Sequence, residues 1–451
     1  MEYFNETKNI FGNLKDRIVH RNFSGNAGIA LRNSIYQISS NLISKIGSLI
    51  FTIIIARILL PEVFGLYNLA ISTLIVIISI SDFGVGETSI RFISKICGKD
   101  ERKAKGYFIY LTKIKMIFIV AAIILLSISA KTISENYYHK PLFLGLMAGT
   151  LYVFFYGVGS ILKNSFEALN NFKVNFYSEL IFQIVRLVII SFVVLFALKM
   201  GYNDETLLFY MIVGLSVCYF IYFLFFIVNR SKLSFLAYEA KSLDVKEKKQ
   251  LNYFLIMMSA TAFSGVFFSY VDRIMLGRFV GAEFIGYYAA AFSLVGSAIP
   301  LIALSGAFLP VFSRMQKKEL KIFFKKSSKI ILMTSVLAFL FFFLFSKYLV
   351  LIVFGENYMS SVGIMKSLSL LLIIVPITSL ISTYIISMGK PVIVTKALLT
   401  STLANIMLNY ILILILIGWG EIYAVYGVVV ATIISNMIYL AILTVYSRKI
   451  S

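Results

Sequence analysis

Long apolar runs separated by short polar segments follow one another along the whole chain. Examples extend from Ile109 to Ala130, from Leu180 to Leu198, from Ile330 to Phe345 and from Ile406 to Trp419. A helix of about 20 mainly apolar residues crosses the roughly 30 Å of hydrocarbon in a bilayer. This pattern predicts an all-α membrane protein with about twelve transmembrane helices, at residues 29–57, 64–85, 106–130, 142–163, 175–198, 206–229, 252–275, 284–310, 328–353, 366–388, 394–417 and 424–446.

The composition supports a membrane protein and excludes several soluble classes. The 451 residues are 59% hydrophobic and 14% charged, whereas soluble domains are nearer half apolar and a quarter charged. The chain has two cysteines and two histidines, so we expect no metal site, no disulfide framework and no cofactor. The net charge of +21 has no basic soluble domain to carry it, so we expect no nucleic-acid partner.

The basic residues predict the orientation of the chain. With these spans, 32 of the 42 Lys and Arg residues lie on the face that holds both termini, 8 lie on the other face, and Lys45 and Arg186 lie inside helices. Cytoplasmic loops of membrane proteins carry such an excess of positive charge. We therefore expect a multi-pass protein of the cell membrane with both termini in the cytoplasm.

The chain contains an internal repeat. A shift of 221 residues gives seven identities in twenty ungapped positions, and a shift of 219 superposes the corner at residues 169–171 and the fifth helix on residues 388–390 and the eleventh helix. The identical residues are Ile53, Arg57, Glu62, Gly65, Tyr67, Ala70 and Ser72, aligned with Ile274, Arg278, Glu283, Gly286, Tyr288, Ala291 and Ser293.

The repeat predicts two six-helix lobes. Six is an even number, so both halves enter the membrane in the same sense and are related by a pseudo-two-fold axis along the membrane normal. We assign residues 1–230 to the N-terminal lobe, 231–250 to a cytoplasmic linker and 251–451 to the C-terminal lobe. Proteins built this way usually bind their substrate between the lobes.

The first helix carries a polar stripe that is unusual for a membrane span. At 100° per residue its polar side chains fall within about 120° of arc and include Asn41 and Lys45, with Arg32 nearer the cytoplasm. A charge at the centre of a bilayer costs about 2.5–3.5 kcal/mol, so Lys45 needs a partner or a wet cavity. We expect these three residues to line a substrate cavity, with a backbone partner for Lys45 and headgroup contact for Arg32 as alternatives.

The fifth helix repeats this pattern. Glu179, Gln183 and Arg186 share one of its faces, and the repeat places Asn405 of the eleventh helix opposite Arg186. An Arg fork and a Lys point charge in such a cavity suit an anionic phosphate cargo. The alternative is that Glu179 pairs with Arg186 and joins two helices.

Three further charges are candidates for a gate or for ion coupling. Arg57 ends the first helix, where contact with lipid headgroups is the simpler explanation. Asp272 and Arg273 lie near the end of the seventh helix. Asp272 could form a gate ion pair, a cation-coupling carboxylate or a surface pair.

Two motifs resemble those of a known transporter family. The segment from Ala56 to Tyr67, followed by Ser81-Asp82-Phe83-Gly84, is similar to the opening helical hairpin of the polysaccharide-biosynthesis flippases. The segments Asp272 to Gly277 and Gly281 to Tyr288 resemble the start of that family's second half, and Met388-Gly389-Lys390-Pro391 its matching corner. The flippases belong to the multidrug/oligosaccharidyl-lipid/polysaccharide exporter superfamily.

The resemblance implies two lobes, arranged as in the multidrug exporters of that superfamily, that open a central cavity to each side in turn. The cargo would be an oligosaccharide or polysaccharide repeat unit, such as that of an O-antigen, linked to a polyprenyl phosphate or pyrophosphate. It would move from the cytoplasmic to the outer leaflet, driven by H+, Na+ or the membrane potential. We expect a monomer in contact with lipid and with other polysaccharide-assembly proteins.

Two other functions compete with this interpretation. A multidrug/cation antiporter of the same superfamily would need intramembrane carboxylates, and only Glu179 and Asp272 are candidates. A membrane glycosyltransferase or polymerase would need catalytic acids or bases on a sizeable loop. The loops on the outer side are short and hold no paired catalytic groups, so we expect no enzymatic activity.

Overall fold

The computed structural model describes residues 25–303, 312 and 317–450, and twelve of the helices in this part of the chain are long and apolar enough to cross a membrane. The predicted number of spans and the all-α class are confirmed. The helices are α2 Gly25–Ile58, α3 Pro61–Asp82, α4 Val85–Ile96, α5 Glu101–Lys131, α6 Phe143–Ala168, α7 Phe172–Lys199, α8 Asp204–Val228, α9 Val245–Phe279, α10 Ala282–Ala303, α12 Lys317–Phe354, α13 Ser361–Leu368, α14 Leu371–Ser387, α15 Pro391–Leu416 and α16 Glu421–Ile450. The shorter turns are η1 Thr132–Tyr138, η2 Arg230–Lys232, η3 Ser234–Ala237, η4 Glu356–Tyr358 and η5 Ile417–Trp419.

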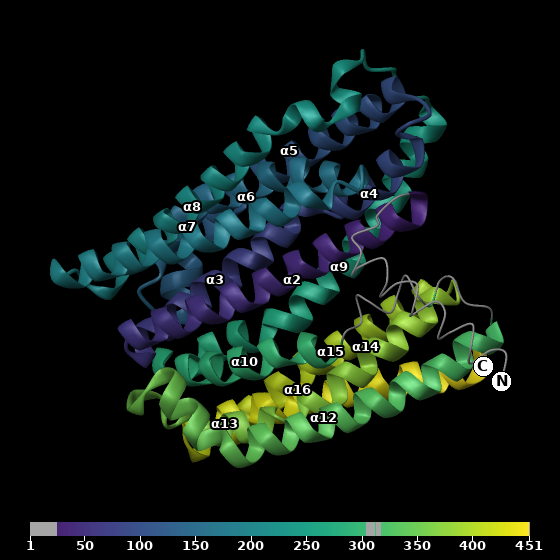
Figure 1. Ribbon diagram of the computed structural model, residues 1–451. Coiled ribbons are helices and arrows are strands. Elements are labelled where there is room, and N and C mark those ends of the chain that lie inside the picture. The colour runs from purple at the N-terminus through teal and green to yellow at the C-terminus, as the bar shows by residue number, and fades with distance from the viewer. Residues whose placement is uncertain (1–24, 304–311, 313–316, 451) are drawn as a thin grey trace.

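The helices form two groups with α9 between them (Figure 1). The first group contains α2 to α8, and the second contains α10 to α16. Helix α9 begins beside α4 of the first group and packs against α15 and α16 of the second. The described chain begins and ends on one side of the bundle, which we call the terminal face, and the other side is the opposite face.

The segment between the lobes is bound to the first lobe. The amine of Lys105 donates to the backbone oxygens of Leu236 and Tyr238, and Lys103 forms an ion pair with Glu247 at the start of α9. The linker predicted at 231–250 is therefore ordered against α5. The assignment of residues 251–451 to the second lobe stays a prediction.

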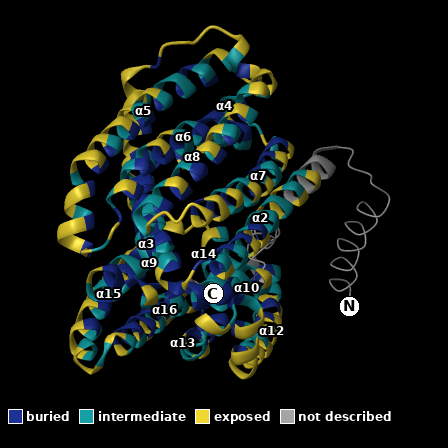
Figure 2. Ribbon diagram, turned by 90° about the vertical axis from the view of Figure 1, so that its left-hand side faces the viewer, coloured by how far each residue is buried: buried dark blue, intermediate teal, exposed yellow. Residues whose placement is uncertain are grey.

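Exposed side chains cover the flanks of the bundle, as lipid contact requires. Figure 2 shows many exposed residues on α5, α12 and α15. Ile128 on α5 is 76% exposed and Ile352 on α12 is 68% exposed. In contrast, α3 and α10 lie inside the bundle, and the most apolar stretch of α3 is 67% buried. These two helices form the contact between the lobes.

Two local features differ from the predicted spans. The second span ends at Asp82 because Phe83 and Gly84 adopt left-handed conformations, with φ of 41° and 72°. The chain then forms α4, an amphipathic helix whose twelve residues are too few to cross a bilayer and which the apolar pattern did not predict. The tenth span is divided into α13 and α14 at Ser369 and Leu370.

The backbone reproduces the internal repeat at the two corners that it aligned. At the first corner Asn170 has φ of 55° and Asn171 N donates to Phe166 O. At the second, Gly389 has φ of 75° and Lys390 N donates to Ile385 O, each exactly 219 residues later. Both corners are helix C-terminal caps of the same type.

The closest approach between the lobes lies on the pseudo-two-fold axis. A Cβ atom added to Gly65 of α3 would collide with the carbonyl oxygen of Ala282, and one added to Gly286 of α10 would collide with that of Pro61. Both pairs are related by the shift of 221 residues. Glycine is therefore required at both positions for α3 and α10 to meet near the opposite face.

We predict that Gly65→Ala destabilises the closed contact of the lobes. The added methyl group meets backbone atoms that cannot rotate away, and overpacking of this kind costs about 1–3 kcal/mol. Thermal unfolding of the purified protein should show a lower midpoint. Gly265→Ala in α9 is the matched control, because nothing lies within 4 Å of its added Cβ. An equal effect of both substitutions would contradict the packing argument.

Candidate functional site

A chain of hydrogen bonds connects the predicted polar residues of α7. Glu179 accepts from Gln183 at 2.6 Å, and Arg186 donates to Gln183 at 2.6 Å and to Ser48 of α2 at 3.2 Å. The direct Glu179–Arg186 ion pair considered from the sequence is not formed. Gln183 connects the two charges, so a rotation of its amide would affect both.

Arg186 lies between α2 and α7. Its guanidinium stacks on the ring of Phe51 at 4.4 Å and approaches that of Phe182 at 5.4 Å. Its buried Nε has no acceptor among the described residues. All of these contacts are inside the first lobe, so in this conformation Arg186 joins two helices and its remaining capacity for hydrogen bonds is one N–H group.

Lys45 and Asn41 are exposed on α2, one turn apart. Lys45 shares a helical face with Ala56, because eleven residues complete three turns. Ala56 is fully buried at the end of α2 that contacts α10 and α12. Lys45 therefore lies on the side of α2 that meets the second lobe, and no ion pair or hydrogen bond of its amine is found within the described ranges. Arg32 is also exposed, closer to the terminal face.

A small cavity of about 100 Å³ opens beside these residues, and we call it the polar cavity. Helices α2, α6 and α7 form it, and Asn175 and Glu179 of α7 contribute to its wall. The full lining is Gln37, Ser40, Asn41, Ser44, Lys163, Glu167, Phe172, Asn175 and Glu179. Asn41 and Glu179, predicted from separate helices, are thus brought together, whereas Lys45 is outside the lining.

A second polar centre surrounds Asp272 in the other lobe. Its carboxylate accepts hydrogen bonds from Tyr288 at 2.6 Å, Thr432 at 2.7 Å and Asn409 at 2.8 Å. Asp272 is 3% exposed and is the one fully buried acidic side chain among the described residues. The surface-pair interpretation of Asp272 is therefore wrong, because α9 turns this residue into the lobe.

Asn405 and Arg273 lie near this centre but have different surroundings. Asn405 is 1% exposed, donates to Ser435 and accepts from Asn409, so it belongs to the Asp272 network and does not line a cavity in this conformation. Arg273 is part-buried and lies over the ring of Phe292 at 5.0 Å. In the described part of the chain it forms no ion pair with Asp272.

The two centres occupy equivalent positions and carry opposite charges. The repeat aligns Phe51 with Asp272 and Arg186 with Asn405, so an Arg stacked on Phe in one lobe corresponds to an Asp bound by Asn residues in the other. Tyr288, which donates to Asp272, is the equivalent of Tyr67. The repeat has kept its backbone and reversed the sign of its central charge.

Arginines at the opposite face connect the lobes. Arg57 at the end of α2 donates to carbonyl oxygens at the end of α12, and its repeat equivalent Arg278 at the end of α9 donates to those at the end of η1. The contacts are Arg57 Nε to Val353 O at 2.8 Å, Arg57 Nη2 to Ile352 O, Arg278 Nη1 to Tyr137 O at 2.8 Å and Arg278 Nη1 to Asn136 O at 3.2 Å. Cations stabilise helix C-termini, so these two pairs hold the opposite face closed.

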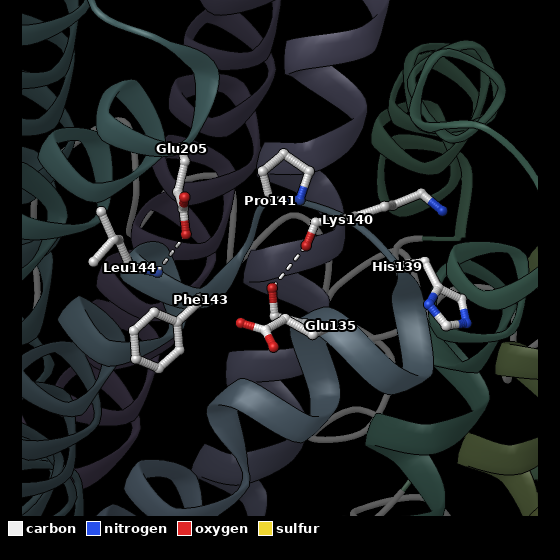
Figure 3. A pocket seen from close by; sticks show the side chains of 8 residues that line it. Glu135, His139, Lys140, Pro141, Phe143, Leu144 and Glu205 are labelled. Atoms are coloured by element: carbon white, nitrogen blue, oxygen red, sulfur yellow. Dashed lines mark hydrogen bonds between the residues drawn. The ribbon is translucent and has the colours of Figure 1, made fainter.

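A larger cavity of about 560 Å³ lies beside this contact (Figure 3). Figure 3 shows Glu135, His139 and Lys140 around it, with Glu205 accepting from Leu144 N at 3.2 Å. The Lys140 amine donates to Gly277 O of α9 at 2.7 Å, and burial lowers the pKa of this amine. Lys140 is therefore a third cation that bridges the lobes here.

One buried charge was missed by the sequence analysis. Lys115, which we assigned to the charged cluster of the terminal face, is 1% exposed and bonds to Asp82 at 2.5 Å and to Ser160 at 2.7 Å. Its side chain turns into the lobe because Asp82, the last residue of α3, supplies the partner. The Asp82-Phe83-Gly84 motif was the available signal, but it gave no sign of the partner.

The comparison with protein families decides the membership of the chain. The profile of the family described as "Polysaccharide biosynthesis protein" matches residues 30–316. The chain belongs to this family. The resemblance seen in the sequence is confirmed, and with it the exporter superfamily of membrane transporters to which the family belongs. No curated protein sequence matches the chain.

Solved structures share the fold of this family member at low sequence identity. The lipid II flippase MurJ in an inward closed conformation has a TM-score of 0.72 and 16% identity, over 92% of this chain and 87% of that one. An inward-facing multidrug MATE transporter has 0.66 and 14%, over 92% and 98%. A transporter from Pyrococcus furiosus, described as having a binding pocket of reverse polarity, has 0.61 and 14%, over 94% and 95%.

We predict that removing the two arginines opens the opposite face. Each donates charge-assisted hydrogen bonds, which are worth about 1.5–3 kcal/mol, so Arg57→Gln with Arg278→Gln should shift the equilibrium by tenfold or more. The measurement is the rate at which a water-soluble maleimide labels Ala282→Cys in a protein whose Cys97 and Cys218 are replaced by Ser. Ala282 is 8% exposed at the contact of the lobes.

The exposed Arg230 at the terminal face supplies the matched control, as Arg230→Gln. The control should leave the labelling rate unchanged. Unchanged labelling in the double variant would show that the arginines do not hold the lobes together.

Proposed function

We propose that this protein transports a lipid-linked oligosaccharide, or a polysaccharide repeat unit, across the cell membrane. The cargo is a sugar chain on a polyprenyl phosphate or pyrophosphate. The lobes hold the sugar and phosphate between them while the polyprenyl tail stays in the lipid, and they open to each side in turn. The family membership and the fold shared with a lipid II flippase support this function.

One observation carries the assignment of an anionic cargo. Lys45 presents an amine without a partner among the described residues, on the side of α2 that meets the second lobe. An ammonium within a membrane span needs a counter-charge or water. A phosphate group of the cargo supplies that counter-charge, and Arg32, exposed nearer the terminal face, attracts the same group on its way in.

The closed contacts give the transport a direction. Under the positive-inside rule the terminal face is cytoplasmic, and the opposite face is external. Arg57, Arg278 and Lys140 close the external side, so the state seen in the structure receives cargo from the cytoplasm. Release to the outer leaflet requires that these contacts break and that the cytoplasmic ends of the lobes approach each other.

Asp272 is the candidate for coupling to an ion. A buried carboxylate held by three neutral donors is charged at an energetic cost that either a proton or a bound Na+ removes. Occupation of this group alters the hydrogen bonds that connect α9 with α10, α15 and α16, and α9 is the helix that lies between the lobes. The membrane potential remains the alternative driving force.

A multidrug/cation antiporter is the competing function, and Asp272 is the observation in its favour. We favour the anionic cargo because Asp272 is covered by its donors, whereas Lys45 is exposed. The two functions differ in a simple assay. A sensitised host that expresses the protein should gain no resistance to cationic drugs, and a lipid-linked sugar should move in reconstituted vesicles.

We predict that Lys45→Met slows transport of a lipid-linked oligosaccharide by about 10–100-fold, the range expected for one charge-assisted contact. Proteoliposomes that report sugar exposure on the outer leaflet provide the measurement. Lys347→Met on α12 is the matched control, since Lys347 is exposed in a span of the second lobe. Full activity of the Lys45 variant would reject the proposed phosphate contact.

We predict that Asp272→Asn removes the dependence of transport on an ion gradient but retains slow downhill movement. The amide keeps the shape of the carboxylate and cannot take up a proton or balance a cation. Proteoliposomes with an imposed pH gradient, Na+ gradient or membrane potential separate the three driving forces. A gradient response equal to that of the unmodified protein would exclude Asp272 from coupling.

A further inference from the structure

The polar cavity has a surplus of hydrogen-bond acceptors. Glu167 accepts from Asn175 at 3.2 Å, and Glu179 accepts from Gln183. Asn175 is 5% exposed, and its Oδ1 has no donor among the described residues. A buried acceptor without a donor destabilises the protein, and a ligand that brings an O–H or N–H group to it restores the missing hydrogen bond.

The charges of the cavity select the class of ligand. Lys163 lies 3.7 Å from Glu167 and balances it, which leaves the carboxylate of Glu179 in excess. A phosphate would be repelled from such a site, because phosphate and carboxylate are both acceptors with negative charge. Hydroxyl groups donate to carboxylates and amide oxygens, so a neutral sugar fits the cavity.

The fold does not require this cavity. The repeat aligns Glu167, Asn175 and Glu179 with Ile386, Val394 and Leu398, and the corner between these helices has the same hydrogen bonds in both lobes. The second lobe therefore builds the same backbone from apolar residues. A polar group that only one copy of a repeat carries has a role other than folding.

The cavity also lies at a suitable distance from Lys45. Asn41 lines the cavity, and Lys45 follows four residues later on the same helix, a rise of about 6 Å. The first sugar of a lipid-linked oligosaccharide is bonded directly to its phosphate. One cargo molecule can thus place its phosphate at Lys45 and its first sugar ring in the cavity, on the cytoplasmic side of Lys45.

We propose that the polar cavity is the subsite that recognises hydroxyl groups of the first sugar of the cargo, through Glu167, Asn175 and Glu179. This inference rests on the proposed function, since it assumes that the cargo is a glycosylated lipid phosphate. The cavity determines which sugar is accepted, and Lys45 binds every cargo by its phosphate.

Binding to short-chain probes tests the subsite on the purified full-length protein. The probes are prenyl pyrophosphates that carry glucose, galactose or N-acetylglucosamine, and a prenyl pyrophosphate capped with a methyl group, which has the same charge and no sugar. The unmodified protein should bind at least one sugar probe tenfold more tightly than the capped probe. Asn175→Val and Glu167→Gln should remove this difference and leave affinity for the capped probe unchanged.

Three controls keep the outcomes distinct. The Asn175→Val substitution introduces the residue that the second lobe already has, so its folding is checked by the thermal unfolding midpoint. Glu356→Gln, an exposed acid at the opposite face, should have no effect. Lys45→Met should weaken binding of all probes equally.

Failure of the subsite and failure of the proposed function give different results. If the unmodified protein binds none of the probes, the proposed function is wrong. If it binds sugar and capped probes equally, or if the cavity variants keep the tenfold preference, the subsite is wrong and the function stands. A cavity variant that alters only the response to a pH gradient would identify the two carboxylates as a proton site and overturn the proposal.

Discussion

A charge inside a bilayer must have a partner, water or a ligand, and this constraint determines how the whole structure is interpreted. Most intramembrane charges of this protein satisfy it internally. Arg186 is shared between Gln183, Ser48 and two aromatic rings, and Lys115 is paired with Asp82. Lys45 is the exception that gives the protein its function, because its amine is exposed where the lobes face each other.

The pseudo-two-fold axis separates structure from function. Features that occur twice, such as the Gly65 and Gly286 contact, the Arg57 and Arg278 pairs and the two helix corners, hold the lobes together and close one face. Features that occur once, such as Lys45, the polar cavity and Asp272, carry the chemistry. Equal backbones with opposite central charges allow one lobe to bind the cargo and the other to respond to an ion.

The sequence was sufficient for the architecture, because its signals are long and repeated. Runs of apolar residues predicted twelve spans, and identities at a fixed shift predicted two equivalent halves. It was less informative about individual polar residues. Helical spacing placed Glu179, Gln183 and Arg186 on one face, but only the packing of α2 on α7 shows that Arg186 is consumed by aromatic rings. Spacing likewise gave no sign that α9 turns Asp272 into the lobe or that Lys115 meets Asp82 across two helices.

The surroundings of Lys45 can be measured directly. In a protein with Cys97 and Cys218 replaced by Ser, Lys45→Cys is compared with Ile46→Cys, whose neighbouring position is 50% exposed and carries an apolar side chain. A water-soluble, membrane-impermeant thiol reagent applied from the cytoplasmic face should label position 45 quickly and position 46 slowly, because position 45 faces water between the lobes and position 46 faces lipid. Slow labelling at both positions, with fast labelling by a lipid-soluble reagent, would place Lys45 in the bilayer and contradict the account.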